Sequence, residues 1–298
     1  MGIGRLCNLF GKSRQAYYDR NYFNEEKRKD EIVALELVVG IRRELPGLGG
    51  HKLHWLMRQP LKTHGIKLGR DKLFKLLRQH NLLIKKRKIV PKTTDSMHWL
   101  KKYPNLFKEF VISQSEEVWV SDITYICVGN DFNYLFLITD AHSHKIVGYC
   151  LHSLLTKEGA LLALDMALKT RTKFLAGMIH HSDRGIQYCS FDYVRNLKDN
   201  GIEISMTENG DPYENAMAER INGILKNEFG LHKLFKTHYE ATLAIQSSIN
   251  AYNQYRPHMS CNNMTPDQAH ETELELIKLW KPRKPRTRSP TEIKELKE

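Results

Sequence analysis

Three acidic residues occupy positions that suit a catalytic carboxylate: Asp122 in WVSDITY, Asp183 in HHSDRGIQY and Glu219 in ENAMAER. Asp122 falls inside a stretch rich in β-branched and aromatic residues, where an unpaired charge is costly. Asp183 follows a short apolar run, and strand ends are where α/β sheets gather ligand sites. Carboxylate oxygens are the ligands that Mg²⁺ and Mn²⁺ prefer, and two such ions activate an attacking oxygen and stabilise the leaving one. The three acids therefore predict a two-metal site for phosphoryl transfer that needs no protein nucleophile.

Each of these acids also has an ordinary structural explanation. Asp122 could protect an edge strand from aggregation, and Asp183 could form a turn before Arg-Gly. Asp140, at the end of another predicted strand, could lie near the site. Glu214 and Glu219 are five positions apart, about 140° around a helix, so only one of them can face a metal. We assign Glu214 to the helix cap.

The stretch DPYENAMAERINGILK, from Asp211 to Lys226, predicts the helix that carries Glu219. Asp211 is a good N-cap, and Pro212 suits the first helical position. Residues three, four or seven apart share a helix face, so one polar stripe contains Asn215, Glu219, Asn222, Gly223 and Lys226. Such a stripe suits a close approach to a phosphate backbone, although a solvated helix face is the more usual explanation.

Composition points to a polyanionic partner. The 298-residue chain has a formal net charge of +12 and an ordinary hydrophobic fraction of 41%. Nucleic acid suits this charge better than a membrane, because no apolar run approaches the roughly 20 residues that span a bilayer. The five cysteines form no C-x-x-C pair, which argues against structural zinc and favours free thiols in a cytoplasmic protein.

The pattern around the acids predicts a mixed sheet. We expect five strands and three helices, in the order β-β-β-α-β-α-β-α: strands at 117–128, 133–142, 144–152, 177–183 and 202–206, with helices at 156–170, 190–200 and from 211. This order predicts an α/β domain with a five-stranded mixed sheet flanked by helices, the ribonuclease-H-like fold. His180 and His181 are adjacent in a strand and face opposite ways, so we expect packed histidines there and not metal ligands.

The N-terminal part predicts an all-α region. Helical spacing indicates helices at 30–45, 52–58 and 70–80, with a turn at Pro60 and Gly65, which is a helix-turn-helix pattern, although a plain helical bundle is an equal alternative. The third helix would bury Leu73, Leu76 and Leu77 and expose basic residues. A basic run follows, and the candidate DNA contacts here are Lys72, Lys75, Arg78, Lys85, Lys86, Arg87 and Lys88.

These patterns divide the chain into five segments. They are a basic helical segment (1–29), a helix-turn-helix region (30–90), a linker (91–112), the catalytic core (113–270) and a C-terminal helix end with a basic tail (271–298). Within the last two segments we expect helices at 239–252 and 265–280.

The motifs together resemble the catalytic subunit (OrfB) of insertion-sequence family three transposases, which are relatives of retroviral integrases. The resemblance rests on WVSDITY, HHSDRGIQY, the 35 residues between Asp183 and Glu219, the lysine seven positions after Glu219, and YNQYRPH. It covers nearly the whole chain. Three departures are Glu214 where the family usually has Asp, Arg220 where it has Ser, and Gly-Gly-His-Lys where it has Gly-Tyr-Arg-Arg.

The resemblance implies a DDE transposase that cuts and joins DNA at the ends of an insertion sequence. Asp122, Asp183 and Glu219 would bind two Mg²⁺ or Mn²⁺ ions, and Lys226 would contact the DNA end, with Asn215 and Arg220 beside it. The implied partners are terminal inverted repeats, target DNA, further copies of the chain and an upstream-frame helix-turn-helix protein as a fusion. The implied location is the bacterial cytoplasm, at the nucleoid. A DNA-binding regulator with a decayed core and a nuclease of the same fold remain alternatives.

Overall fold

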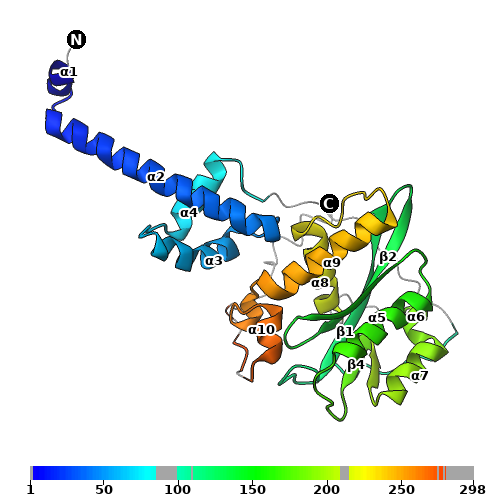
Figure 1. The fold of residues 1–298 in the computed structure, drawn as a ribbon. Coiled ribbons are helices and arrows are strands. Elements are labelled where there is room, and N and C mark those ends of the chain that lie inside the picture. Colours follow the sequence, from blue (N-terminus) through cyan, green and yellow to red (C-terminus); the bar gives the residue numbers. More distant parts are fainter. Residues whose placement is uncertain are drawn as a thin grey trace, which may run out of the picture.

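The computed structural model describes residues 3–84, 99–108, 110–208, 215–273, 275–277 and 279. Figure 1 shows a sheet with helices on both faces, and a helical N-terminal region beside it from which one long helix projects. In the described part of the chain, none of the helices combines the length and the apolar character needed to cross a membrane.

The sheet has five strands in the order β3-β2-β1-β4-β5. They are β1 (Val118–Val128), β2 (Asp131–Asp140), β3 (Ile146–His152), β4 (Ile179–Ser182) and β5 (Glu203–Met206). β1, β2 and β3 form an antiparallel meander, whereas β4 runs parallel to β1 and to β5. This is the predicted ribonuclease-H-like arrangement.

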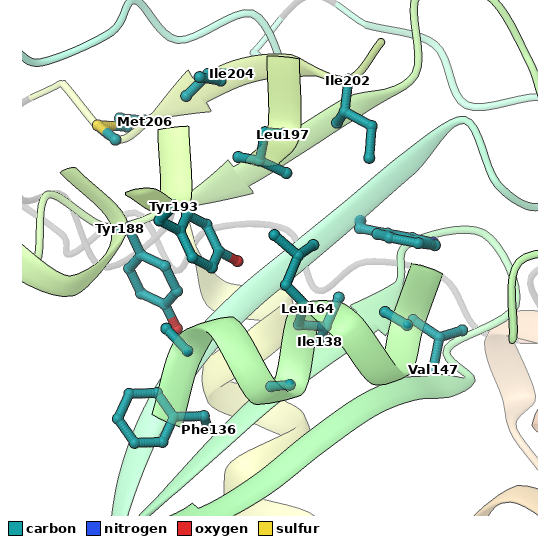
Figure 2. Close-up of a cluster of buried hydrophobic side chains, with 14 of the residues drawn as sticks. Phe136, Ile138, Val147, Leu164, Tyr188, Tyr193, Leu197, Ile202, Ile204 and Met206 are labelled. Atoms are coloured by element: carbon teal, nitrogen blue, oxygen red, sulfur yellow. The ribbon is translucent and has the colours of Figure 1, made fainter. Parts of the chain in front are cut away.

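Alternation along β2 divides the core between the two faces of the sheet. Phe136 and Ile138 point to the face covered by α5 (Lys157–Thr170), α6 (Ile186–Cys189) and α7 (Phe191–Asp199), as Figure 2 shows. Leu135 and Leu137 belong to the opposite core, with α8 (Ala216–Glu228) and α9 (His238–Tyr255). The sheet is therefore buried on both sides, with α8 held against one face.

The N-terminal region contains α1 (Ile3–Leu9), α2 (Arg14–Glu44), α3 (Gly50–Thr63) and α4 (Arg70–Gln79). Leu73, Leu76 and Leu77 are buried, as predicted. The predicted helix start at residue 30 is wrong: α2 runs 31 residues from its Ser13 cap, because no proline and only one late glycine interrupts it. The predicted turn at Pro60 is also wrong, since α3 continues for three residues and buries Leu61.

The helical region packs directly on the core. The Gly47 N–H donates to the Glu228 carbonyl at 2.6 Å, at the end of α8. A Cβ on Gly47 would lie 2.4 Å from the Glu228 Cα, so only glycine permits this approach. Ala251 of α9 joins the apolar cluster of α2, α3 and α4.

Two predicted segments differ from the structure. The described end of the expected linker packs against the sheet beside β5, where the Leu106 N–H donates to Ser205 Oγ at 2.9 Å. The helix expected over 265–280 is much shorter: α10 is Pro266–Glu271, closed by a Thr265–Gln268 capping box. Beyond it the backbone pairs with the turn of η1 (Met259–Cys261), where the Leu279 N–H donates to the Met259 carbonyl at 2.8 Å. Residues 280–298 lie outside the described part.

Candidate active site

Parallel pairing of β1 with β4 brings the two predicted aspartates together. The paired positions run from Val118 with Ile179 to Val120 with His181. Asp122 and Asp183 each lie two residues beyond the last pair, Asp122 within β1 and Asp183 directly after β4. Because parallel neighbours advance in step, both carboxyl groups reach the same region of the sheet.

Helix α8 brings Glu219 to this region. The Asn215 side chain, at the N-cap, donates to the Ser121 carbonyl at 3.1 Å. The Asn222 side chain donates to Asp122 Oδ2 at 2.7 Å. Glu219 lies four residues after Asn215 and three before Asn222, so it shares the helix face that contacts β1.

Electrostatics indicates that the three acids interact. Burial raises the pKa of Asp122 to about 7, and the charge of Asp183 adds to this effect, with a smaller contribution from Glu219. Hydrogen bonds from the Ile123 N–H, at 2.9 Å, and from Asn222 oppose the rise in this pKa. Asp183 Oδ1 accepts from the Gly185 N–H at 3.0 Å. The site therefore concentrates negative charge that a cation would offset.

The donor set suits a hard divalent cation, because all three predicted ligands are carboxylates. Among the described residues, however, no group of three or more His, Cys, Asp or Glu side chains is arranged to hold a metal ion. The side chain of Glu219 is exposed on the first turn of α8, and its effect on Asp122 is weaker than that of Asp183. Of the two other acids, Asp183 therefore acts more strongly on Asp122 than Glu219 does.

Comparison with known proteins decides the family. Two family models described as "Integrase core domain" match residues 113–212 and 200–266. The chain is 36% identical over 265 residues to "Insertion element IS600 uncharacterized 31 kDa protein" of Shigella sonnei, covering 88% of this chain and 96% of that protein. The chain belongs to the insertion-sequence family three transposases, of the DDE class.

Two other relatives are described as transposases. This transposase is 29% identical over 263 residues to "Transposase for insertion sequence element IS629" of Shigella sonnei, covering 86% of each chain. It is 33% identical over 171 residues to "Transposase InsF for insertion sequence IS3A" of Escherichia coli, covering 57% of this chain and 59% of the relative.

Retroviral integrases are among the similar solved structures. The HTLV-2 integrase catalytic core domain in complex with magnesium aligns with a TM-score of 0.43 and 18% identity, over 53% of this chain and 98% of that one. A simian T-cell lymphotropic virus intasome aligns with a TM-score of 0.47 and 19% identity, over 81% of this chain and 80% of that one. Neither likeness bears on the residues of the site.

Lys226 lies one turn beyond Asn222 on α8 of the transposase. Its ammonium is 3.7 Å from the centre of the Tyr125 ring, a cation–π contact with β1. Burial lowers the pKa of Lys226, while the charge of Asp122 opposes this effect. The sequence placed Asn222 only in the polar stripe of this helix and gave no role to Tyr125, because their contacts join residues far apart in the chain.

The remaining candidate DNA contacts divide into three groups. Arg220, Lys72, Lys75 and Arg78 are exposed, the last three on α4. Asn215 is only 7% exposed and hydrogen bonds to β1, which argues against the DNA contact expected of it. The third group, Lys85, Lys86, Arg87 and Lys88, lies outside the described residues, as do the predicted cap residues Asp211, Pro212 and Glu214. Helix α8 begins at Ala216, four residues later than the predicted Pro212 start.

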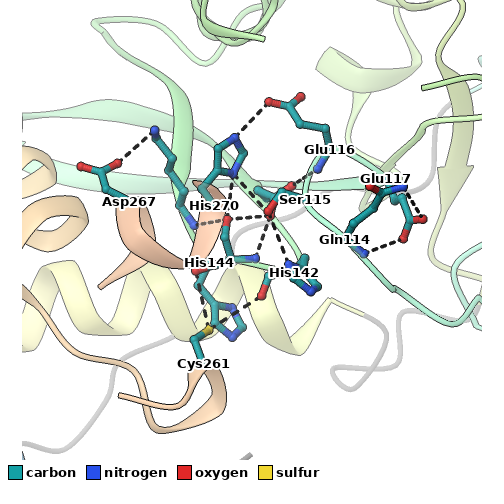
Figure 3. A network of polar contacts seen from close by, with 12 residues as sticks. Gln114, Ser115, Glu116, Glu117, His142, His144, Cys261, Asp267 and His270 are labelled. Carbon is teal, nitrogen blue, oxygen red and sulfur yellow. Dashed lines mark hydrogen bonds and ion pairs between the residues drawn. The ribbon is translucent and has the colours of Figure 1, made fainter. Parts of the chain in front are cut away.

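His180, His181 and Asp140, the other polar residues considered for the site, contribute to the interior of the protein. His180 Nε2 lies 2.6 Å from Ser121 Oγ and 2.9 Å from the Tyr193 hydroxyl, and His181 Nδ1 lies 2.8 Å from Ser205 Oγ. Both histidines are therefore packed, as expected. Asp140 is fully buried and accepts from the Glu116 N–H and from Ser143, so it belongs to a separate network near His270, drawn in Figure 3.

Proposed function

We propose that this transposase cuts DNA at the ends of its insertion sequence and joins the released 3′-OH to target DNA, with Asp122, Asp183 and Glu219 as metal ligands. The observation that carries the proposal is geometric: the pairing of β1 with β4 brings Asp122 and Asp183 to one region of the sheet, and the Asn222–Asp122 hydrogen bond holds there the helix α8 that carries Glu219. Integrase core enzymes depend on a metal. Two Mg²⁺ or Mn²⁺ ions at the three carboxylates would activate the attacking oxygen and stabilise the leaving one.

The residues around the acids would orient the substrate. Asn222 fixes one oxygen of Asp122 and leaves the other directed by the Ile123 N–H. Lys226, held over the Tyr125 ring, places a point charge where a phosphate of the DNA end would lie. Arg220 is exposed beside Glu219 and adds a second positive charge at the DNA end.

The DNA-binding elements complete the proposal. The exposed basic face of α4, with Lys72, Lys75 and Arg78, would bind the terminal inverted repeats. The segments 30–90 and 113–270 would act as the helix-turn-helix and catalytic units, with α2 extending the first. A homo-oligomer would bring the two ends of the element together, and a fusion with the upstream-frame product would add a further DNA-binding unit. The protein would act at the nucleoid in the bacterial cytoplasm.

Strand joining tests the proposal. The purified chain is incubated with labelled DNA carrying the element's own ends, in Mg²⁺ and separately in Ca²⁺, beside the Asp122→Asn and Glu219→Gln variants. We expect joined product with Mg²⁺ alone, loss of product in both variants, and unchanged DNA binding in all three proteins. Cleavage that persists in Asp122→Asn would refute the assignment of the site.

Two other outcomes identify the alternatives. Cutting without joining would indicate a nuclease of the same fold. Binding without chemistry, both in the chain alone and in a fusion with the upstream product, would indicate a DNA-binding regulator with a decayed core.

A further inference from the structure

A groove runs between the helical region and the catalytic core. Its volume is about 800 Å³. Helix α3 and the start of α4 form one side, and the turn at η1 forms the other. The lining residues are His51, Lys52, His54, Trp55, Arg58, Gly69, Arg70, Asp71, Lys72, Met259 and Asn263.

The side chains of this groove are strongly basic. Four of the lining residues are lysine or arginine, and Asp71 is the acid among them. Asp71 already forms an ion pair, because its Oδ1 lies 3.0 Å from Arg70 Nε. Trp55 is 37% exposed in the same wall and offers an aromatic surface. This combination of cations with an aromatic ring matches the chemistry of a nucleic-acid backbone.

Lys52 of the groove lies close to two further cations, and its own charge depends on them. Burial lowers the pKa of Lys52 to about 7, and Arg256 and Arg220 lower it further while Glu228 opposes them. Glu228 is already held by Arg256 through two contacts of 2.8 Å. Lys52 is therefore only partly protonated near pH 7 in the free protein, and the negative charge of a bound phosphate would favour its protonated form.

Packing contacts fix the position of the helical side of the groove relative to the catalytic core. Gly47, just before α3, donates to the end of α8, and the cluster of apolar residues under α3 and α4 includes Ala251 of α9. A ligand in the groove would therefore contact both the DNA-recognition helices and the core that carries Glu219. Its position would set the distance between the recognised sequence and the cut.

We propose that this groove binds the sugar-phosphate backbone of the element's end DNA, so that one duplex contacts α3 and the η1 turn together. The inference rests on the proposed function for the identity of the ligand. It adds a contact separate from the outer face of α4, which would read the repeat through Lys75 and Arg78. Backbone contacts here would position the duplex without reading its sequence.

A matched pair of asparagines tests the groove from its catalytic side. Asn262 and Asn263 both have left-handed backbones, with φ of 51° and 58°, and Asn263 lines the groove whereas Asn262 does not. Aspartate tolerates this backbone region, so Asn263→Asp and Asn262→Asp add the same charge at little conformational cost. From the helical side, Arg58→Gln removes a groove cation, and Arg195→Gln on the exposed side of α7 is its control.

Binding of end DNA in Ca²⁺ is measured by fluorescence anisotropy at several salt concentrations. Each phosphate contact contributes a factor of about 3.5 to the loss of affinity between roughly 50 and 200 mM salt. We expect Arg58→Gln and Asn263→Asp to bind several-fold more weakly at low salt and to lower the salt slope by about 1, with both control variants at wild-type values. Thermal unfolding of all four variants checks that they fold.

The outcomes separate this inference from the proposed function. Wild-type affinity and salt slope in both groove variants, or equal losses in the controls, would overturn the groove even if the wild-type chain joins strands. Weaker binding confined to the groove variants would support it even if the chain joins nothing.

Discussion

Protonated His270 is predicted to stabilise the fold by bridging two buried acids. Its Nε2 lies 3.1 Å from Glu116 Oε1, and its Nδ1 lies 3.8 Å from Asp140 Oδ1 and 3.0 Å from Ser143 Oγ (Figure 3). Burial alone would lower the pKa of His270, but hydrogen bonds and charge from Asp140 and Glu116 raise it to about 9. The histidine comes from α10, and the acids come from the turn before β1 and the end of β2, so the network fastens α10 to the sheet.

The magnitude follows from the shift in this pKa. The rise from 6.5 to about 9 corresponds to roughly 3 kcal/mol of stability, at about 1.4 kcal/mol for each pKa unit. Because the folded-state pKa is raised, this contribution is fully present below pH 6.5 and is lost as pH rises towards 9. His270→Gln removes the titrating group and leaves two buried acids with a neutral partner.

Urea unfolding followed by tryptophan fluorescence at pH 6, 7.5 and 9.5 measures this contribution, since Trp119 is fully buried. We expect the free energy of unfolding of the wild type to fall by about 3 kcal/mol relative to His270→Gln across this range. His64→Gln, an exposed substitution after α3, should keep the wild-type pH dependence. The same pH dependence in wild type and His270→Gln would refute the reasoning.

Two further predictions concern the site and the junction of the two regions. Asn222→Ala removes the hydrogen bond to Asp122 and should raise the Mg²⁺ concentration needed for strand joining by roughly 10- to 100-fold. Asn227→Ala on the same helix is the control and should leave that concentration unchanged. If both variants need the same Mg²⁺ concentration, Asn222 does not position Asp122. Gly47→Ala forces a Cβ against the backbone of α8 and should cost about 1–3 kcal/mol in urea unfolding. Its control is Gly40→Ala inside α2, where a Cβ meets nothing within 4 Å and the change should be neutral or stabilising.

Local sequence patterns determined the elements of the core and the candidate ligands. The alternation of β-branched and aromatic residues placed all five strands within a few residues of their observed bounds, since side-chain period is a property of the strand itself. The costly position of Asp122 within such a strand marked it as a candidate metal ligand. The helix ends were predicted less well. A helix start was expected at residue 30, inside the observed α2, and a helix was expected from 265 to 280, where α10 ends at Glu271.

Tertiary structure alone decided which distant groups meet. Asn222 and Asp122 are 100 positions apart, and Asp140 and His270 are 130 apart, so no local period could pair them. The sequence by itself determined which segments form strands and helices and which positions carry acids, because these features depend on the residues themselves and on their near neighbours in the chain. The fold determined that Asn222 directs Asp122, that Asp140 belongs to a structural network and that α3 forms a basic groove with η1, because these contacts depend on how helices pack against one sheet.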